Sequence, residues 1–246
     1  MRKKQGEAVS GIMLILLLMG MLSLAFNVQL AGSFVPPPTP QWTQTYGGTS
    51  NDYAQSVVQT SDRGYALTGY TYSYGAGSAD FWSVKTDSNG NVKWNQTYGG
   101  AGDERAFSVV QTSDGGYALA GDTSSYGIGY FSFWLVKTDP AGNMQWSRTY
   151  GIGIASRCYS MVQTSDGGYA LFGLTWDWGP RGLASNFLLV KTDLNGNVQW
   201  SRTYGGADLA SSMVQTSDGG YALAGCTWSY GTGSRDFWLV KTDSAG

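Results

Sequence analysis

Aromatic residues recur at four places along the chain, each time a few residues before a side chain that can bind a hydroxyl group. Flat rings offer apolar faces on which the CH groups of a sugar can stack, and Asp or Asn side chains hydrogen-bond to its hydroxyls. The pattern predicts a binding surface for a glycan or a protein, and the competing interpretation is that the rings pack between structural units. The candidate ligand-binding residues are Tyr72, Tyr74, Asp80, Tyr126, Trp176, Trp178, Asn186, Trp228, Tyr230 and Asp236, and Ser132 stands at the matching position of the second place.

Carboxylates are the other side chains that could do chemistry in this sequence. The chain has no histidine and, outside its N-terminal segment, Glu104 is its only glutamate. An enzyme built on this chain would depend on carboxylate chemistry such as glycoside hydrolysis, with Asp52, Asp103, Glu104 and Asp208 as the acids of the long loops. Adjacent acids on a loop are usually only solvated. We therefore predict no catalytic residue and keep a carboxylate-dependent glycoside hydrolase as an alternative.

These side chains recur because the sequence repeats with a period of roughly 52 residues. Four near-copies share the sequences W-x-x-T-Y-G-G, Q-T-S-D-G-G-Y-A-L-A-G and F-W-L-V-K-T-D, and Trp42, Trp94, Trp146 and Trp200 are spaced 52, 52 and 54 residues apart. A period of this length indicates supersecondary units that bury their apolar faces against one another. We place the repeats at 41–93, 94–145, 146–199 and 200–246.

Each copy holds four strand-like runs, which in the first copy are Gln41–Tyr46, Gln55–Thr60, Tyr65–Thr71 and Phe81–Asp87. The Ser-Asp-Gly-Gly and Asn-Gly-Asn sequences predict tight hairpins and therefore an antiparallel meander. The fourth run is apolar at odd and even positions, which indicates a strand covered on both faces. The prediction is an all-β fold, a β-propeller or propeller segment of four four-stranded blades, with a linear β-solenoid as the alternative.

The order of the runs bears on ring closure. Gln41–Tyr46 could pair beside the last fourth-type run, Phe237–Asp243, and close a ring of four blades; alternatively, the copies form a segment of a longer propeller. In both arrangements a meander sends the tight hairpins to one pole and the long, variable aromatic loops to the other. Function on a rigid scaffold usually lies in such variable loops.

The segments Gln111–Gly121 (Q-T-S-D-G-G-Y-A-L-A-G) and Phe237–Asp243 (F-W-L-V-K-T-D) carry a family resemblance. The chain resembles secreted prokaryotic β-propeller-like repeat proteins over residues 41–246, and it is distantly similar to quinoprotein-type and lectin-type propellers. The resemblance implies a propeller fold and an exported location, and it transfers no catalytic residue. A chain without histidine offers no equivalent of a quinone site, so no cofactor is predicted.

The N-terminal segment predicts export. Met1–Glu7 is basic and Ala8–Phe26 is an apolar run long enough for a hydrophobic helix. We predict a signal peptide or membrane anchor at 1–33, a Pro-rich spacer at 34–40 and the repeat domain at 41–246. The repeats are then extracellular or at the cell surface, with membrane contact only through the N-terminal segment if it is not cleaved.

Composition limits the partners. From Phe34 onward the chain has 12 basic against 16 acidic residues and no basic tract, which argues against nucleic acid. The repeated hairpin aspartates lack the dense spacing of a metal site. Cys158 and Cys226 make no metal motif, and their pairing cannot be read from the sequence. The sequence predicts an exported, non-enzymatic binding or adhesion module for a glycan or a surface protein, with a purely structural cell-envelope protein as a further alternative.

Overall fold

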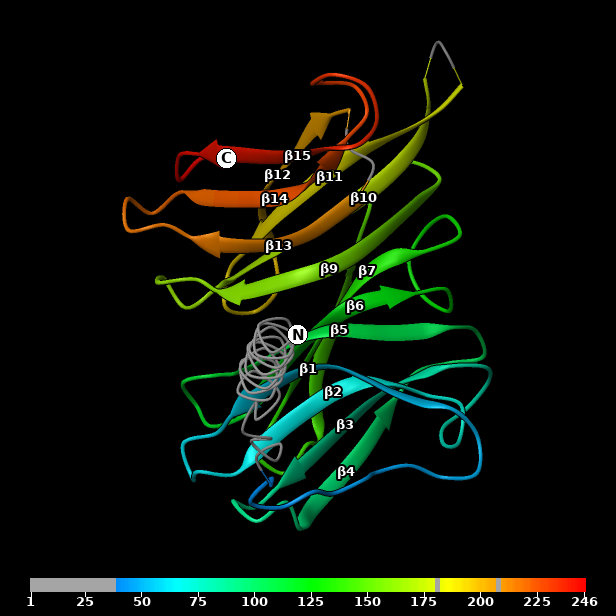
Figure 1. The fold of residues 1–246 in the computed structure, drawn as a ribbon, viewed down its shortest axis with the longest axis vertical. Helices are drawn as coiled ribbons and strands as arrows, with labels where there is room; N and C mark the ends of the chain where they lie inside the picture. The colour runs from blue at the N-terminus through cyan, green and yellow to red at the C-terminus, as the bar shows by residue number, and fades with distance from the viewer. Residues whose placement is uncertain (1–38, 180–181, 207–208) are drawn as a thin grey trace, which may run out of the picture. The chain divides into compact units, whose positions relative to one another are not determined.

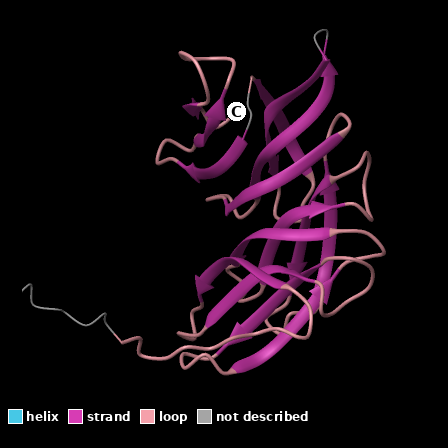
Figure 2. Ribbon diagram, turned by 45° about the vertical axis from the view of Figure 1, so that its right-hand side comes forward, coloured by secondary structure: helices cyan, strands magenta, loops and turns pink. Residues whose placement is uncertain are grey.

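The computed structural model describes residues 39–179, 182–206 and 209–246. The chain divides into two units, Met1–Gln41 and Trp42–Gly246, and all of the described secondary structure belongs to the second. This described part consists of strands and loops, without a helix (Figure 2). The predicted N-terminal helix lies outside the described residues. Within the described ranges, no helix has the length and apolar character needed to span a membrane.

Four antiparallel sheets are arranged as the blades of a propeller, and we number them 1 to 4 in chain order (Figure 1). The predicted all-β fold is therefore confirmed. Three described blades have four strands, and the last has three. Blade 1 contains β1 (Asp52–Gln59), β2 (Tyr65–Thr71), β3 (Asp80–Thr86) and β4 (Val92–Tyr98); blade 2 contains β5 (Glu104–Gln111), β6 (Tyr117–Thr123), β7 (Ser132–Thr138) and β8 (Met144–Tyr150); blade 3 contains β9 (Ala155–Gln163), β10 (Tyr169–Gly179), β11 (Gly182–Thr192) and β12 (Val198–Gly205); blade 4 contains β13 (Leu209–Gln215), β14 (Tyr221–Thr227) and β15 (Asp236–Thr242).

Each complete sheet combines the last three strand-like runs of one sequence repeat with the first run of the next. The strands follow one another as a meander, and the register of the third strand with the fourth is the same in each complete blade. In blade 1, Phe81 pairs with Tyr98 and Lys85 with Trp94. The Trp and Tyr of the W-x-x-T-Y sequence thus mark the outer strand of a blade.

The core lies between the blades rather than inside any one of them. The strand predicted to be covered on both faces is buried at every residue in blade 2, where it is β7. Phe81 of blade 1 packs its ring 4.7 Å from Trp134 of blade 2, and Phe187 of blade 3 packs 4.6 Å from Trp238 of blade 4. Because each apolar face needs a neighbouring sheet, the blades are stable only as a stack.

Residues Trp42–Tyr46 lie outside the strands but occupy a recurring position. The Trp42 ring lies 5.9 Å from Tyr65, and the Tyr46 hydroxyl donates to the carbonyl oxygen of Gly90 at 2.7 Å. Trp94 and Tyr98 of β4 contact blade 2 in the same way, through Tyr117 and Gly142. The segment therefore packs on blade 1 as an outer strand packs on the blade that follows it.

Blade 4 leaves an open face in this structure. Among the described strands β15 pairs with β14 alone, so the pairing of Trp42–Tyr46 with β15 that would close a ring is not formed. Phe237 is fully exposed, whereas its equivalents Phe81, Phe133 and Phe187 are fully buried. The difference follows from the absence of a sheet against this face in the described part of the chain.

Candidate functional site

The meander separates two poles of the described domain (Figure 1). The hairpin pole is formed by tight turns such as 60–64 and 87–91, which join the first strand to the second and the third to the fourth. The loop pole is formed by the connections from the second strand to the third and from one blade to the next. Its described residues are 47–51, 72–79, 99–103, 124–131, 151–154, 206 and 228–235, together with the ends of β10 and β11 at 176–179 and 182–183.

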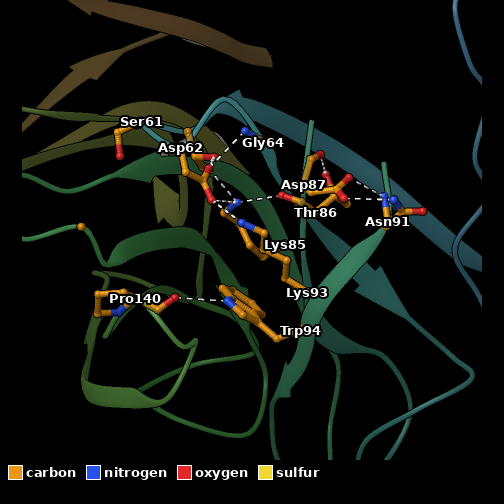
Figure 3. A network of polar contacts seen from close by, with 12 residues as sticks. Ser61, Asp62, Gly64, Lys85, Thr86, Asp87, Asn91, Lys93, Trp94 and Pro140 are labelled. Atoms are coloured by element: carbon orange, nitrogen blue, oxygen red, sulfur yellow. Dashed lines mark hydrogen bonds and ion pairs between the residues drawn. The ribbon is translucent and has the colours of Figure 1, made fainter. Parts of the chain in front are cut away.

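The hairpin pole is stabilised by an ion pair that recurs in each blade, and Figure 3 shows the copy in blade 1. Lys85 is buried and lies 3.0 Å from Asp62, which also pairs with Lys93 at 2.7 Å. These ammonium groups, Lys93 first, and the Thr60 hydroxyl hold the pKa of Asp62 well below its usual range. The same Lys–Asp pair recurs in every blade, which is expected of a scaffold element: Lys137–Asp114, Lys191–Asp166 and Lys241–Asp218.

Three of the predicted aromatic residues fasten the loops to the scaffold. Tyr74 packs 5.5 Å from Trp82, and its hydroxyl donates to the carbonyl oxygen of Gly47 at 3.0 Å. Tyr126 repeats both contacts in blade 2, with Trp134 and Gly99. Tyr230 packs 5.4 Å from Trp238 in blade 4. These contacts are of the kind that the structural interpretation of the repeated rings expects, although all three side chains also remain exposed.

The polar residues at the matching position before the third strand support their own loops. The hydroxyl of Ser132 donates to the carbonyl oxygen of Ile128 at 2.8 Å, and a carboxylate oxygen of Asp236 accepts the backbone N–H of Thr232 at 3.0 Å. Asn186 begins the pairing of β11 with β12, opposite Gly205. None of these three residues lines the cavity between blades 2 and 3 described below.

The carboxylate of Asp80 lies next to that of Glu104, between blades 1 and 2. A Cβ atom at Gly99 would lie 1.7 Å from Oδ1 of Asp80 and 2.8 Å from Oε2 of Glu104, so both carboxylates border this glycine. Both side chains are buried, and Oδ2 of Asp80 has no hydrogen-bond partner among the described residues. Burial, followed by the charge of Glu104, raises the pKa of Asp80 to about 6.

Glu104 itself ties the loop pole together. Its carboxylate accepts hydrogen bonds from the backbone N–H of Gly100 at 2.7 Å, the hydroxyl of Thr123 at 2.8 Å and the backbone N–H of Ser125 at 3.1 Å. Asp52 plays the same part in blade 1, where it accepts from Gly48, Thr71 and Ser73. Asp52 and Glu104, two of the carboxylates that a hydrolase could use, instead accept hydrogen bonds from loop residues in the structure. Asp208 lies outside the described residues.

The loops of blades 2 and 3 border an open cavity of about 560 Å³ with an aromatic lining. Trp178 and Tyr130 stand on its rim and are 72% and 74% exposed. Trp176 is half-buried and packs against the core between blades 3 and 4. The complete lining is Tyr130, Phe131, Ile154, Ala155, Arg157, Tyr159, Trp176, Trp178 and Leu183.

Backbone hydrogen bonds between the loops hold this lining in place. The N–H of Tyr130 donates to the carbonyl oxygen of Ile154, and the N–H of Ile154 donates to that of Trp176, both at 2.8 Å. The N–H of Ser156 donates to the carbonyl oxygen of Phe131 at 2.8 Å. The β10–β11 hairpin is paired from Tyr169 and Thr192 out to Gly179 and Gly182, which carries Trp176 and Trp178 on extended strands. A site built on paired backbone is largely formed before a ligand arrives.

Arg157 is the charged residue of the lining. Its guanidinium carbon lies 4.1 Å from the centre of the Phe131 ring, which is a cation–π contact. Its Nε lies 3.8 Å from Oδ2 of the fully buried Asp122, beyond hydrogen-bond distance. Both carboxylate oxygens of Asp122 lack a hydrogen-bond partner among the described residues. Burial therefore prevails over the charges of Arg157 and Arg105 and raises the pKa of Asp122 to about 7.

The raised pKa values of Asp80 and Asp122 predict that the protein loses stability as the pH rises from about 4 to 7. In this range the folded state holds up to two protons that the unfolded state releases, until Asp80 ionises near pH 6 and Asp122 near pH 7, so the free energy of unfolding falls with increasing pH. Asp114 and Asp166 act in the opposite sense, but their pKa values are lowered to about 2, so their contribution is lost only below pH 4.

Urea unfolding at pH 5 and pH 8 measures this dependence. We expect a free energy of unfolding higher at pH 5 by more than about 1.4 kcal/mol, the equivalent of one pKa unit. Asp122→Asn should flatten the difference because the amide does not titrate. Equal stability at the two pH values, or greater stability at pH 8, would show that these carboxyl groups are ionised in the folded protein.

The structure sorts the predicted aromatic residues into different environments. Trp176 and Trp178 share the cavity, whereas Tyr72 contacts Arg105 and Trp228 lies beneath Arg235. Sequence reasoning missed Tyr130, which follows the repeated loop aromatic by four residues, and Arg157, which had no visible partner in the sequence. Arg157 could have been identified from its equivalence to Arg105 in the preceding repeat, since each arginine follows the equivalent loop of its own repeat.

The cysteines do not contribute to this site. Cys158 is buried and Cys226 is half-buried, and both are free thiols. Burial raises the pKa of Cys158 far above its usual range, so the group is a protonated, unreactive core residue. Within the described residues, no group of three or more His, Cys, Asp or Glu side chains could hold a metal ion.

Comparison with known proteins adds no family assignment. No protein-family model matches the chain, and no curated protein shows significant similarity to it.

Proposed function

We propose that this chain is an exported, non-enzymatic binding or adhesion module that recognises glycans through the cavity between blades 2 and 3. Its place is outside the cell or at the cell surface, where the apolar N-terminal segment would direct it. A protein on another surface is the second partner class that an exposed aromatic rim would suit. Neither nucleic acid nor a cofactor has a part in this function.

The observation that carries the proposal is the pair of exposed rings, Trp178 and Tyr130, on the rim of a cavity of about 560 Å³. Two large exposed aromatic side chains that line the same cavity form an apolar patch of the kind that marks binding sites. The volume falls within the range of small-molecule sites. Flat rings at the rim suit the apolar CH faces of a pyranose ring.

A glycan array probed with the full chain tests this function, and binding should depend on the cavity rim. Trp178→Ala is expected to weaken binding at least tenfold, about 1.4 kcal/mol, because the ring supplies stacking area. Trp228→Ala is the matched control, since this tryptophan is 63% exposed but lies on blade 4, outside the cavity lining. Equal losses in the two variants would place binding elsewhere on the loop pole, and the absence of any glycan ligand would favour a structural role.

A carboxylate-dependent hydrolase remains the second candidate because of one observation, the adjacent carboxylates of Asp80 and Glu104 with the pKa of Asp80 raised to about 6. Against it, both side chains are buried and Glu104 is engaged by three loop donors. Cleavage of a polysaccharide by the unmodified protein that is lost in a folded Asp80→Asn variant would support the enzyme. If neither the unmodified protein nor the variant cleaves any polysaccharide, the result supports the binding module.

A further inference from the structure

Two arginines at equivalent positions of successive repeats have different partners. Arg105 in blade 2 donates from Nη2 to the carboxylate of Asp103 at 3.2 Å and to the hydroxyl of Tyr72 at 3.3 Å. Arg157 in blade 3 stands 52 residues later, and the residue two positions before it is Ala155. Residues two apart on a strand lie on the same face, so the methyl group of Ala155 takes the place of the Asp103 carboxylate.

The missing carboxylate coincides with the cavity. Ala155 and Arg157 both line it, together with the aromatic rim of Trp178 and Tyr130. The side chain of Arg157 is 30% exposed and forms part of the cavity lining, so a ligand in the cavity can reach it. Asp122 gives it only a long ion pair, 3.8 Å from Nε to Oδ2 without a hydrogen bond, and the Tyr159 side chain is its other polar contact, so no carboxylate pairs with it as Asp103 pairs with Arg105.

We infer that the cavity binds an acidic sugar, a uronic or sialic acid residue whose carboxylate takes the place that Asp103 fills beside Arg105. This inference rests on the proposed glycan-binding function and specifies its ligand class. The planar guanidinium pairs with a carboxylate through two parallel N–H donors, and Phe131 fixes its plane from the other side. The rings of Trp178 and Tyr130 then cover the sugar ring.

The test compares a panel of uronic-acid and sialic-acid trisaccharides, each beside its methyl ester, by calorimetric titration of the full chain. Esterification removes the negative charge and leaves the sugar ring unchanged. We expect at least one acid to bind about tenfold more tightly than its ester, the effect of a hydrogen-bonded charge pair. The pair of variants Ala155→Asp and Ala155→Asn gives a matched control for volume.

Ala155→Asp supplies Arg157 with the carboxylate that Arg105 already has, so it should lower the affinity for the acid to that for the ester. Ala155→Asn should keep the preference for the acid, and Arg157→Gln should remove it. If acid and ester bind equally and both are lost in Trp178→Ala, the acidic ligand class is wrong while glycan binding stands. If neither binds and the neutral glycans of the array fail as well, both proposals are wrong.

Discussion

Gly121→Ala should destabilise the protein by about 3 kcal/mol, the upper end of what overpacking a core costs. Gly121 lies in the middle of β6, where the register of β5 shifts between Ala106 and Ser108. A Cβ atom there would lie 1.9 Å from the carbonyl oxygen of Arg105, a backbone atom that cannot rotate away. The same approach recurs at Gly69, Gly173 and Gly225, so the repeated glycine of the Y-A-L-A-G sequence allows the bulge.

Gly179→Ala is the control for this substitution, because the nearest atom to its added Cβ would be 3.6 Å away. Chemical denaturation of the two variants gives the comparison, and Gly179→Ala is expected to lie close to the unmodified protein. A small effect of Gly121→Ala would mean that β5 can move away from β6, which the paired register of blade 2 does not allow.

Phe133→Ala should cost about 3–5 kcal/mol of stability, the usual loss for a large side chain removed from a core. Phe133 is fully buried in the cluster that joins blades 2 and 3, where Tyr150, Cys158 and Leu188 are also buried. Removing the ring leaves a cavity between two rigid sheets, which cannot collapse to fill it. The free energy of unfolding from a urea titration measures the loss.

The chain contains a control of the same residue type at the same repeat position. Phe237 starts the F-W-L-V-K-T-D sequence of blade 4 but is fully exposed, so Phe237→Ala should change the stability by less than about 0.5 kcal/mol. A loss comparable to that of Phe133→Ala would contradict the open face of blade 4. It would indicate that a sheet covers Phe237 in solution.

Much of the fold could be predicted from the sequence because the same strand and turn patterns occur in each of the four repeats. The Ser-Asp-Gly-Gly and Asn-Gly-Asn turns predict the meander. The apolar residues at odd and even positions of β7 predict a strand buried on both faces, as the structure has it. Of the two arrangements that the repeat allows, the ring closed by pairing of Gln41–Tyr46 with the last strand is not formed among the described strands. Ring closure depends on the angle between blades, which no local pattern encodes.

The candidate site could be predicted less well, because repeated and specialised aromatic residues look alike in a sequence. Tyr126 and Trp178 occupy the same repeat position, yet Tyr126 bonds to Gly99 and Trp178 stands at a cavity rim. The difference arises from the longer β10–β11 pairing, which extends to Gly179 and Gly182. Long-range contacts such as those of Arg157 with Phe131 and Asp122 are likewise set by how blades stack.

The tryptophan indole N–H signals in a nuclear magnetic resonance titration with a glycan test the central claim most directly. The chain carries tryptophans at both poles, and Trp94 at the hairpin pole donates to Pro140 at 3.1 Å. We predict that the signals of Trp176 and Trp178 move with added glycan while those of Trp94 and Trp146 stay in place. Shifts confined to Trp94 or Trp146, or no shift at Trp176 and Trp178 with a bound glycan, would contradict recognition at the loop pole.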